Sequence, residues 1–330
     1  MILREPSADN YAWNWNQRIL VGCKNALTER KCDENFKKSY FACPEAIEIV
    51  PRKKEELSNH DRAHYDLGFE VDDRFLPYYE IFYDLSTCSV IWTKHELLGS
   101  AFDQTAKLRR AETDFRSFPC PDVEFSTAYT QLKQSEQPHL GTNESFYYQK
   151  GHLTPDHDAP YYWWKLATFS YGNVAPEWIT INGEGGNWFM LERFVYRLAV
   201  NDRKRYEIFT GVLPYDPPKY LVPEGKISIP HWFWKVVKHQ TQGVVVFVLN
   251  DPNPSESDVA KKFCPEDQCA ALGWEFPKNR SKGLAHCCSY ESEVLNLIPQ
   301  QASFEELLTL PSYTNKKTAR RRPTETIPLT

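Results

Sequence analysis

The sequence predicts an α+β fold in which a central, mostly antiparallel sheet carries helices on its faces. Short runs rich in aromatic and β-branched residues recur along the chain and are typical of strands. One later segment has the spacing of an amphipathic helix. With 41% hydrophobic and 14% aromatic residues in 330, the chain has enough apolar material for a large packed core, which argues against disorder.

The first 145 residues contain several expected strands, and residues 1–60 carry no catalytic signal. Residues 1–60 mix aromatics with three cysteines, and we interpret them as an N-terminal extension tied down by disulfides. Short aromatic strands are expected at residues 75–83 and 89–93. Residues 121–145 are polar and are predicted to form a loop.

The residues that could carry chemistry are concentrated in one stretch, residues 146–193. We expect a strand that ends at Lys150, because Gly151-His152 should break it, and an irregular loop that starts near Pro155. A second β-prone run spans residues 166–171, and residues 173–186 look like a glycine-containing loop.

A helix is predicted over residues 188–199. Its apolar face repeats at i, i+3, i+7 and i+10, in Trp188, Leu191, Val195 and Leu198. A frame of strand, loop, strand, loop and helix could bring His152 close to an asparagine at the start of this helix.

The remainder of the chain completes the sheet. We expect a strand at residues 206–213, a proline-rich loop at 214–230, and an antiparallel hairpin that pairs 229–237 with 243–249. A cysteine-rich lobe at 260–290 completes a main domain over residues 61–300. Residues 311–330 are basic and poor in apolar residues, which predicts a disordered tail.

The central stretch contains the groups that phosphodiester hydrolysis needs. Histidine titrates near neutral pH and suits a general base that activates water. A hard cation such as Mg²⁺ takes oxygen ligands and keeps several waters, so one Asn carbonyl with a nearby carboxylate would suffice. Composition alone favours a structural or surface role for His152 and a solvated loop position for His157.

The order of residues in this stretch is more specific than its composition. It is carried by Gln149-Lys150-Gly151-His152, Leu153, Pro155, Asp158, Phe169, Asn173-Val-Ala-Pro176-Glu177, Asn182, Trp188 and Glu192. This order resembles the catalytic core of the DNA/RNA non-specific endonucleases, the ββα-metal family. That motif is Asp-Arg-Gly-His with Leu, Pro and Asp, then an aromatic strand, Asn-x-x-Pro-Gln, and an Asn shortly before a Trp-x-x-x-Glu helix. A weaker likeness extends over residues 79–248.

The resemblance implies a role for each matching residue. His152 would be the general base, Asn182 the direct ligand of Mg²⁺ (or Mn²⁺), and Glu192 would hold the water shell of the cation. Lys150 would touch the phosphate, and Arg109 would stabilise the charge of the transition state. Arg110 is the alternative to Arg109.

The sequence departs from the motif in several places. Gln149 replaces Asp, Glu177 replaces Gln, and Lys150 replaces Arg, which keeps the charge but loses the planar bidentate fork. The loop before Trp188 is longer than in the family. Counting from His152 selects Asn182 as the metal ligand, whereas counting back from Trp188 selects Glu184. We prefer Asn182, because the glycines of the loop can absorb the excess.

Nucleic acid is the expected partner although the net charge is −5. Only the groove has to be basic. Candidate residues for it are Arg110, Arg116 and Lys150, each of which taken alone is more simply a solvated side chain. No run of 18 apolar residues occurs, so we expect neither a transmembrane helix nor a membrane partner. The sequence leaves the oligomeric state open.

The cysteines indicate the compartment. All nine lie outside residues 146–193, which predicts disulfides that staple the flanking segments and hence a secreted protein. Residues 1–5 lack the apolar run of a signal peptide, so either a signal has been removed or the protein is intracellular, and the cysteines favour the first alternative. The alternative for Cys264, Cys269, Cys287 and Cys288 is a zinc site with poor spacing.

The implied function is a secreted, Mg²⁺-dependent endonuclease that hydrolyses DNA and RNA to 5′-phosphate ends. Because positions 149 and 150 depart from the motif, catalysis could be reduced. The alternative is a nucleic-acid-binding protein of the same fold with weak or lost activity, as some salivary members of the family are. A disulfide-rich structural protein is a third hypothesis.

Overall fold

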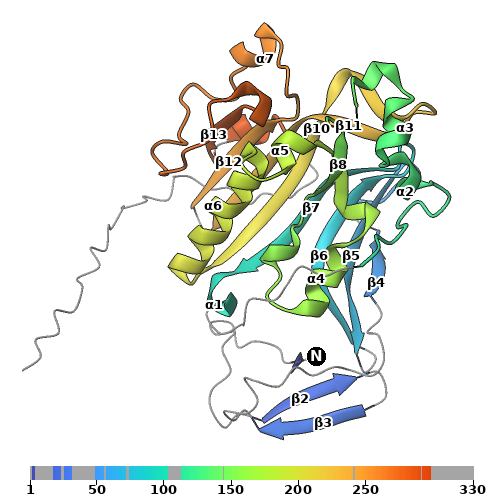
Figure 1. Cartoon of the computed structure of the whole chain (residues 1–330). Coiled ribbons are helices and arrows are strands. Elements are labelled where there is room, and N and C mark those ends of the chain that lie inside the picture. The colour runs from blue at the N-terminus through green and yellow to red at the C-terminus, as the bar shows by residue number, and fades with distance from the viewer. Residues whose placement is uncertain are drawn as a thin grey trace, which may run out of the picture.

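The centre of the fold is one eight-stranded sheet in which every neighbouring pair is antiparallel. The computed structural model describes residues 2–3, 18–23, 26–31, 49–55, 57–71, 74–102, 113–143, 145–240, 242–290 and 292–298. The strand order is β13-β12-β11-β10-β7-β6-β5-β4 (Figure 1). The strands are β4 (Ile49–Lys54), β5 (Arg62–Val71), β6 (Arg74–Asp84), β7 (Ser89–Leu98), β10 (Arg205–Val222), β11 (Lys226–His239), β12 (Gln242–Leu249) and β13 (Ala285–Ser289). The predicted α+β class and the antiparallel sheet are confirmed.

Both faces of this sheet are buried along β11. Phe233 and Val237 pack into the apolar cluster on one face, and Trp232 and Trp234 pack into the cluster on the other. Successive side chains of a strand point to opposite faces, so a strand covered on both sides is an almost unbroken apolar run. The predicted hairpin is confirmed, because β11 pairs with β12 from Trp232 to His239.

A smaller unit packs on one face of the sheet. It consists of the antiparallel pair β8 (Tyr148–His152) and β9 (Val174–Trp178), followed by α5 (Ile179–Asn182) and α6 (Asn187–Asp202) (Figure 1). All four predicted apolar-face residues of α6 are buried, and the Trp188 ring lies 5.0 Å from that of Phe233 on β11. The apolar face of α6 therefore holds this strand–strand–helix unit against the sheet.

The second strand of the unit is not the predicted one. Residues 166–171 were expected to be a strand, but α4 (Tyr162–Thr168) covers most of them, and β9 lies in the segment expected to be a loop. Pro176 fits in β9 because β9 pairs with β8 alone, and on its other side Asn250 bonds to the Trp178 amide and the Pro176 carbonyl. In β8, Gly151-His152 continues the strand instead of breaking it.

Two other segments expected to be loops contain regular structure. Residues 121–145 hold the short helices α2 (Phe125–Ala128) and α3 (Gln131–Ser135) and the 3₁₀ turn η2 (Pro138–Leu140). The proline-rich segment 214–230 belongs mostly to β10 and β11, whose pairing shifts register on both sides of Pro214 and continues to Val222. A bulge of this kind lets prolines remain in a strand.

The remaining described elements are short. They are β1 (Ile2–Leu3), β2 (Arg18–Cys23), β3 (Ala26–Lys31), α1 (Gly99–Phe102), η3 (Asp156–Asp158), η4 (Tyr171–Asn173), α7 (Glu256–Ala260), η5 (Arg280–Lys282) and α8 (Ser292–Leu295). β1 to β3 form a sheet of their own. Most of the predicted N-terminal extension and the whole predicted tail, 311–330, lie outside the described residues. No described helix is both long and apolar enough to cross a membrane.

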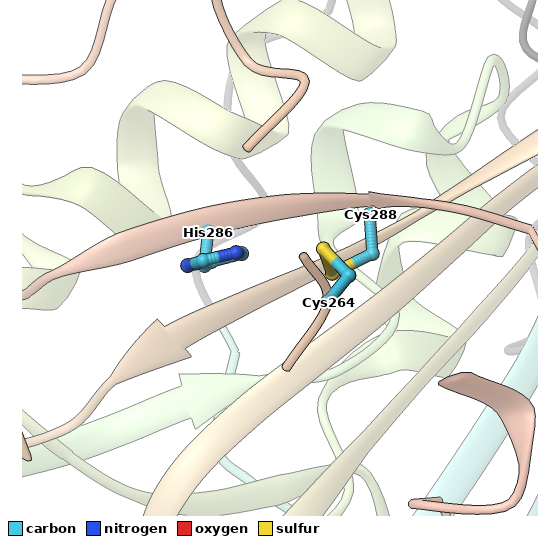
Figure 2. Close-up of side chains that lie close together, drawn as sticks. All are labelled: Cys264, His286 and Cys288. Carbon is cyan, nitrogen blue, oxygen red and sulfur yellow. A yellow bond between two sulfur atoms is a disulfide. The ribbon is translucent and has the colours of Figure 1, made fainter. Parts of the chain in front are cut away.

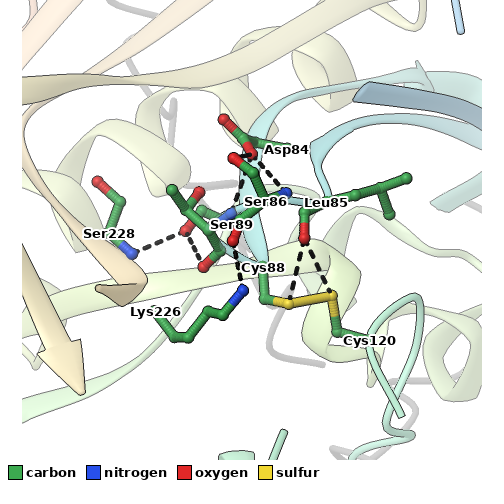
Figure 3. The surroundings of a disulfide bond; sticks show 9 residues. Asp84, Leu85, Ser86, Cys88, Ser89, Cys120, Lys226 and Ser228 are labelled. Atoms are coloured by element: carbon green, nitrogen blue, oxygen red, sulfur yellow. Dashed lines mark hydrogen bonds between the residues drawn. A yellow bond between two sulfur atoms is a disulfide. The ribbon is translucent and has the colours of Figure 1, made fainter. Parts of the chain in front are cut away.

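Three disulfides join six of the described cysteines. Cys88–Cys120 links the β6–β7 turn to the segment before α2, and around it Asp84 accepts from the amides of Ser86 and Thr87 (Figure 3). In the C-terminal lobe Cys264 pairs with Cys288 and Cys269 with Cys287. Figure 2 shows His286 next to the first of these pairs. The zinc alternative is wrong, because all four of its sulfurs are in disulfides.

Candidate active site

The site is built on the β8–β9 ribbon. Gln149 lies directly opposite Glu177, and Gly151 lies opposite Ala175. A Cβ atom on Gly151 would come within 2.3 Å of the Oε2 of Glu177. A larger residue at position 151 would therefore displace the Glu177 side chain or distort the ribbon.

Asn182 is attached to this ribbon by its side chain. Its Nδ2 donates to the Oε1 of Gln149 at 3.0 Å. This bond uses the amide nitrogen of Asn182. The carbonyl oxygen, which is the atom that can ligate a cation, takes no part in it. Asn182 is half-buried, whereas Glu184, the alternative ligand, is exposed.

Glu192 lies on α6, one residue beyond the buried Leu191. Burial raises the pKa of the Glu192 carboxyl to about 7, although His157 and Lys235 act in the opposite direction. Glu192 is half-buried, and it interacts electrostatically with Asp156, His157 and Asp158 in the loop that follows β8.

Glu177 is a second carboxyl in the same place. It is fully buried, and neither of its oxygens has a hydrogen-bond partner among the described residues. Burial raises the pKa of Glu177 well above its usual value, the Glu192 carboxylate raises it further, and Lys235 lowers it. The two carboxyls thus interact electrostatically with each other and with one buried ammonium.

That ammonium, Lys235, is 1% exposed and lies on the face of β11 that the unit covers. Its Nζ donates to the Oγ1 of Thr210 at 2.7 Å, and Thr210 lies opposite both Lys235 and Thr93. Burial lowers the pKa of Lys235, whereas Glu192, Asp158 and Glu177 raise it. Sequence reasoning missed Lys235. The signal was a lysine inside the apolar run Trp232–Val237 at a position that faces inward.

A series of polar side chains continues from Lys235, Thr210 and Thr93 beneath the loop that follows β8. His95 on β7 bonds through Nε2 to the Oδ2 of Asp158 at 3.0 Å, and Thr154 bonds to Thr93 at 2.9 Å. Asn173 joins the two ends of the loop, because its side chain bonds to the amide and carbonyl of Thr154 and to the carbonyl of Thr168. These contacts fix the position of the loop on the sheet.

His152 and Lys150 point to the other face of the ribbon, one residue out of phase with Gln149 and Gly151. The His152 ring lies 5.3 Å from that of Phe115 and 5.2 Å from that of Phe169. The Nζ of Lys150 lies 4.7 Å from the centre of the Phe115 ring. Burial lowers the pKa of Lys150 and Asp114 raises it. Phe115, which sequence reasoning also missed, contacts both side chains.

Of the predicted arginines, Arg116 lies within the described residues. Arg116 donates to the carbonyls of Leu166 and Ala167 at the end of α4, so its guanidinium supports the local fold. Its contact with nucleic acid stays a prediction. Arg109 and Arg110 lie outside the described residues.

The donors gathered at this site fit a hard divalent cation. They are the Asn182 carbonyl and the carboxyls of Glu192 and Glu177, all oxygen atoms, which Mg²⁺ prefers. The oxygens of Glu177 have no hydrogen-bond partner among the described residues. This fits a site for a cation, because burying a carboxyl without any partner is costly. A soft metal would find no sulfur here.

Comparison with known proteins places this geometry in context. The family model for DNA/RNA non-specific endonucleases matches residues 58–288. A salivary endonuclease of Culex quinquefasciatus is 38% identical over 305 residues, which cover 88% of this chain and 81% of that protein. Salivary protein Tsal1 of Glossina morsitans morsitans is 25% identical over 93% of this chain and 82% of its own. A chain of the EndoG/EndoGI complex structure aligns with 63% of this chain and 85% of its own at 18% identity and a TM-score of 0.39.

Proposed function

The chain belongs to the DNA/RNA non-specific endonuclease family, and from that premise we propose that it is a secreted, Mg²⁺-dependent endonuclease that hydrolyses phosphodiester bonds in DNA and RNA to 5′-phosphate ends. The observation that carries this proposal is the bond from Asn182 to Gln149. It attaches the proposed cation ligand to the strand that also carries His152, three positions further on.

The proposed mechanism assigns one task to each side chain. His152 takes the proton of the attacking water at an imidazole nitrogen, which suits a residue whose ordinary pKa is near neutrality. Lys150 provides a positive charge for the phosphate, and its contact with the Phe115 ring restricts its position. Phe115 and Phe169 restrict the ring of His152 in the same way.

The cation would be held by Asn182, with Glu192 and the solvent around it. When bound it would neutralise charge that develops on the phosphate and on the leaving 3′ oxygen. Manganese satisfies the same oxygen donors and would substitute for magnesium.

Secretion is proposed on two grounds. Six of the described cysteines form three disulfides, which persist in oxidising compartments. Two relatives, of Culex quinquefasciatus and Glossina morsitans morsitans, are named as salivary proteins.

A second candidate is a nucleic-acid-binding protein with weak or lost catalysis. It is favoured by position 150, where lysine cannot make the bidentate contact that the family's arginine makes. Both candidates require nucleic acid to reach the same site.

Cleavage of plasmid DNA and double-stranded RNA separates the two candidates. The wild-type protein should cut both with Mg²⁺ and neither with EDTA. His152→Ala should lower the rate by about 10²–10⁴-fold while binding is retained. Equal cutting by wild type and His152→Ala would refute the proposed base, and absence of cutting at high protein concentration would favour the binding protein.

A further inference from the structure

Positions 149 and 177 depart from the family motif together, and the fold makes them partners. The motif has Asp at the first position and Gln at the second, whereas this chain has Gln149 and Glu177. The two residues are directly opposite in the β8–β9 register. Directly opposite residues of an antiparallel pair have their side chains on one face, about 5 Å apart at Cβ. The carboxyl and the amide have therefore exchanged strands.

The amide on β8 keeps one of the functions that a carboxylate could have there. The Oε1 of Gln149 accepts from the Nδ2 of Asn182, and a carboxylate oxygen would accept in the same way. Gln149 therefore orients Asn182, but it cannot supply negative charge.

The carboxyl on β9 can supply that charge at nearly the same place when a cation is bound beside it. Glu177 lies against Gly151, where a Cβ would meet its Oε2 at 2.3 Å and its Cβ at 2.7 Å. It is fully buried, no described residue donates to either oxygen, and it interacts electrostatically with Glu192 and Lys235. A buried carboxyl with no donor costs stability, so a ligand of positive charge is the partner that this position fits.

We propose that Glu177 is a carboxylate of the divalent-cation site, and that it replaces from β9 the acidic side chain that β8 lacks. This inference rests on the proposed function, because it places Glu177 beside the cation that Asn182 and Glu192 would hold. It makes positions 149 and 177 one functional unit that needs one carboxyl and one amide, on either strand.

An isosteric exchange tests this unit. Glu177→Gln removes the charge without changing the volume, and Gln149→Glu with Glu177→Gln returns the charge on the opposite strand while an acceptor for Asn182 remains. The readout is Mn²⁺ affinity, measured by electron paramagnetic resonance of free Mn²⁺ with the full chain and no nucleic acid. Glu224→Gln is the matched control, since it removes an exposed carboxyl in the turn between β10 and β11, away from the site.

Glu177→Gln should bind Mn²⁺ about 10- to 100-fold more weakly than wild type, as is typical when a group around a metal is removed. The double variant should bind Mn²⁺ with an affinity close to that of wild type, and Glu224→Gln should leave the affinity unchanged. Without a cation, Glu177→Gln should unfold at the wild-type temperature or above it, because the amide removes a buried acidic group. An unfolding temperature at or above that of wild type would show that the weaker Mn²⁺ binding is not caused by misfolding.

Three results would overturn the proposal. Wild-type affinity in Glu177→Gln would show that Glu177 takes no part in binding. Equal weakness of a folded Glu177→Gln and a folded double variant would show that the carboxyl cannot be exchanged between strands. Absence of Mn²⁺ binding by the wild-type protein would remove the cation itself, and with it the metal dependence in the proposed function.

Discussion

The Nε2 of His95 lies 3.0 Å from the Oδ2 of Asp158, and both side chains are buried. Burial lowers the pKa of His95, so a neutral imidazole donates to the carboxylate at neutral pH. Burial alone would raise the pKa of Asp158, but His157 and His95 hold it below its usual value. The pair attaches the loop after β8 to the middle of the sheet.

Asp158→Asn should therefore destabilise the protein. The amide oxygen of asparagine can still accept from the Nε2 of His95, so a charged hydrogen bond becomes a neutral one at a cost of about 1 kcal/mol. This cost is measurable as a lower midpoint of urea unfolding. His60→Gln is the control, since the His60–Asp61 pair is exposed and its loss should not move the midpoint. An unchanged midpoint in Asp158→Asn would mean that the pair does not stabilise the loop.

Gly151→Ala should disturb both stability and the site. The new methyl group would lie 2.3 Å from the Oε2 of Glu177, so the carboxyl must move or the ribbon must distort, at a cost of about 1–3 kcal/mol. Thermal unfolding measures the cost. Gly225→Ala, at a turn with open space around the Cβ position but a φ of 73°, is a control for backbone strain without a clash. Equal stability of Gly151→Ala and wild type would contradict the close approach.

Asn182→Ala and Glu184→Ala should separate the two candidate ligands. Because Asn182 is bonded to β8 and Glu184 is exposed, Asn182→Ala should weaken Mn²⁺ binding by at least about tenfold, and Glu184→Ala should not change it. The rise in unfolding temperature on adding Mg²⁺ is an independent measurement, because a bound ligand stabilises the folded state by mass action. The reverse pattern would assign the ligand to Glu184.

The contacts of Glu80 predict that the protein loses stability in acid. It accepts from Lys54 and from His64, each at 2.9 Å. Burial alone would raise the pKa of Glu80, but these partners hold it at about 2, below the ordinary 4.5. A depressed folded-state pKa stabilises the protein above pH 4.5, and this stability is lost as pH falls from 4.5 towards 2. The shift corresponds to about 3 kcal/mol at neutral pH.

Glu80→Gln checks this assignment. Its free energy of unfolding should lie below that of wild type by a constant amount above pH 5, and the two should converge as the pH falls below 4.5. A difference that stays constant down to pH 2 would show that the ion pairs of Glu80 do not cause it.

Local patterns in the sequence were sufficient for much of the fold and for the order of the site residues. The spacing of Trp188, Leu191, Val195 and Leu198 predicted α6, because a helix that packs on a sheet must repeat its apolar residues every 3.6 positions. The apolar runs of β11 and β12 predicted that these two strands pair, because a strand covered on both faces is apolar almost throughout.

Tertiary structure decided what depends on contacts between distant segments. Residues 166–171 have strand propensity, but Tyr79 and Arg116 bind the carbonyls of α4, and β9 became the partner of β8. Three further features could be seen only in the folded chain. They are the pairing of the cysteines, the burial of Lys235 near Glu192 and Glu177, and the position of Gln149 opposite Glu177. A sequence motif fixes which side chains are present in which order. Their charges interact only at distances of a few ångströms, and the packing of the unit on the sheet sets those distances.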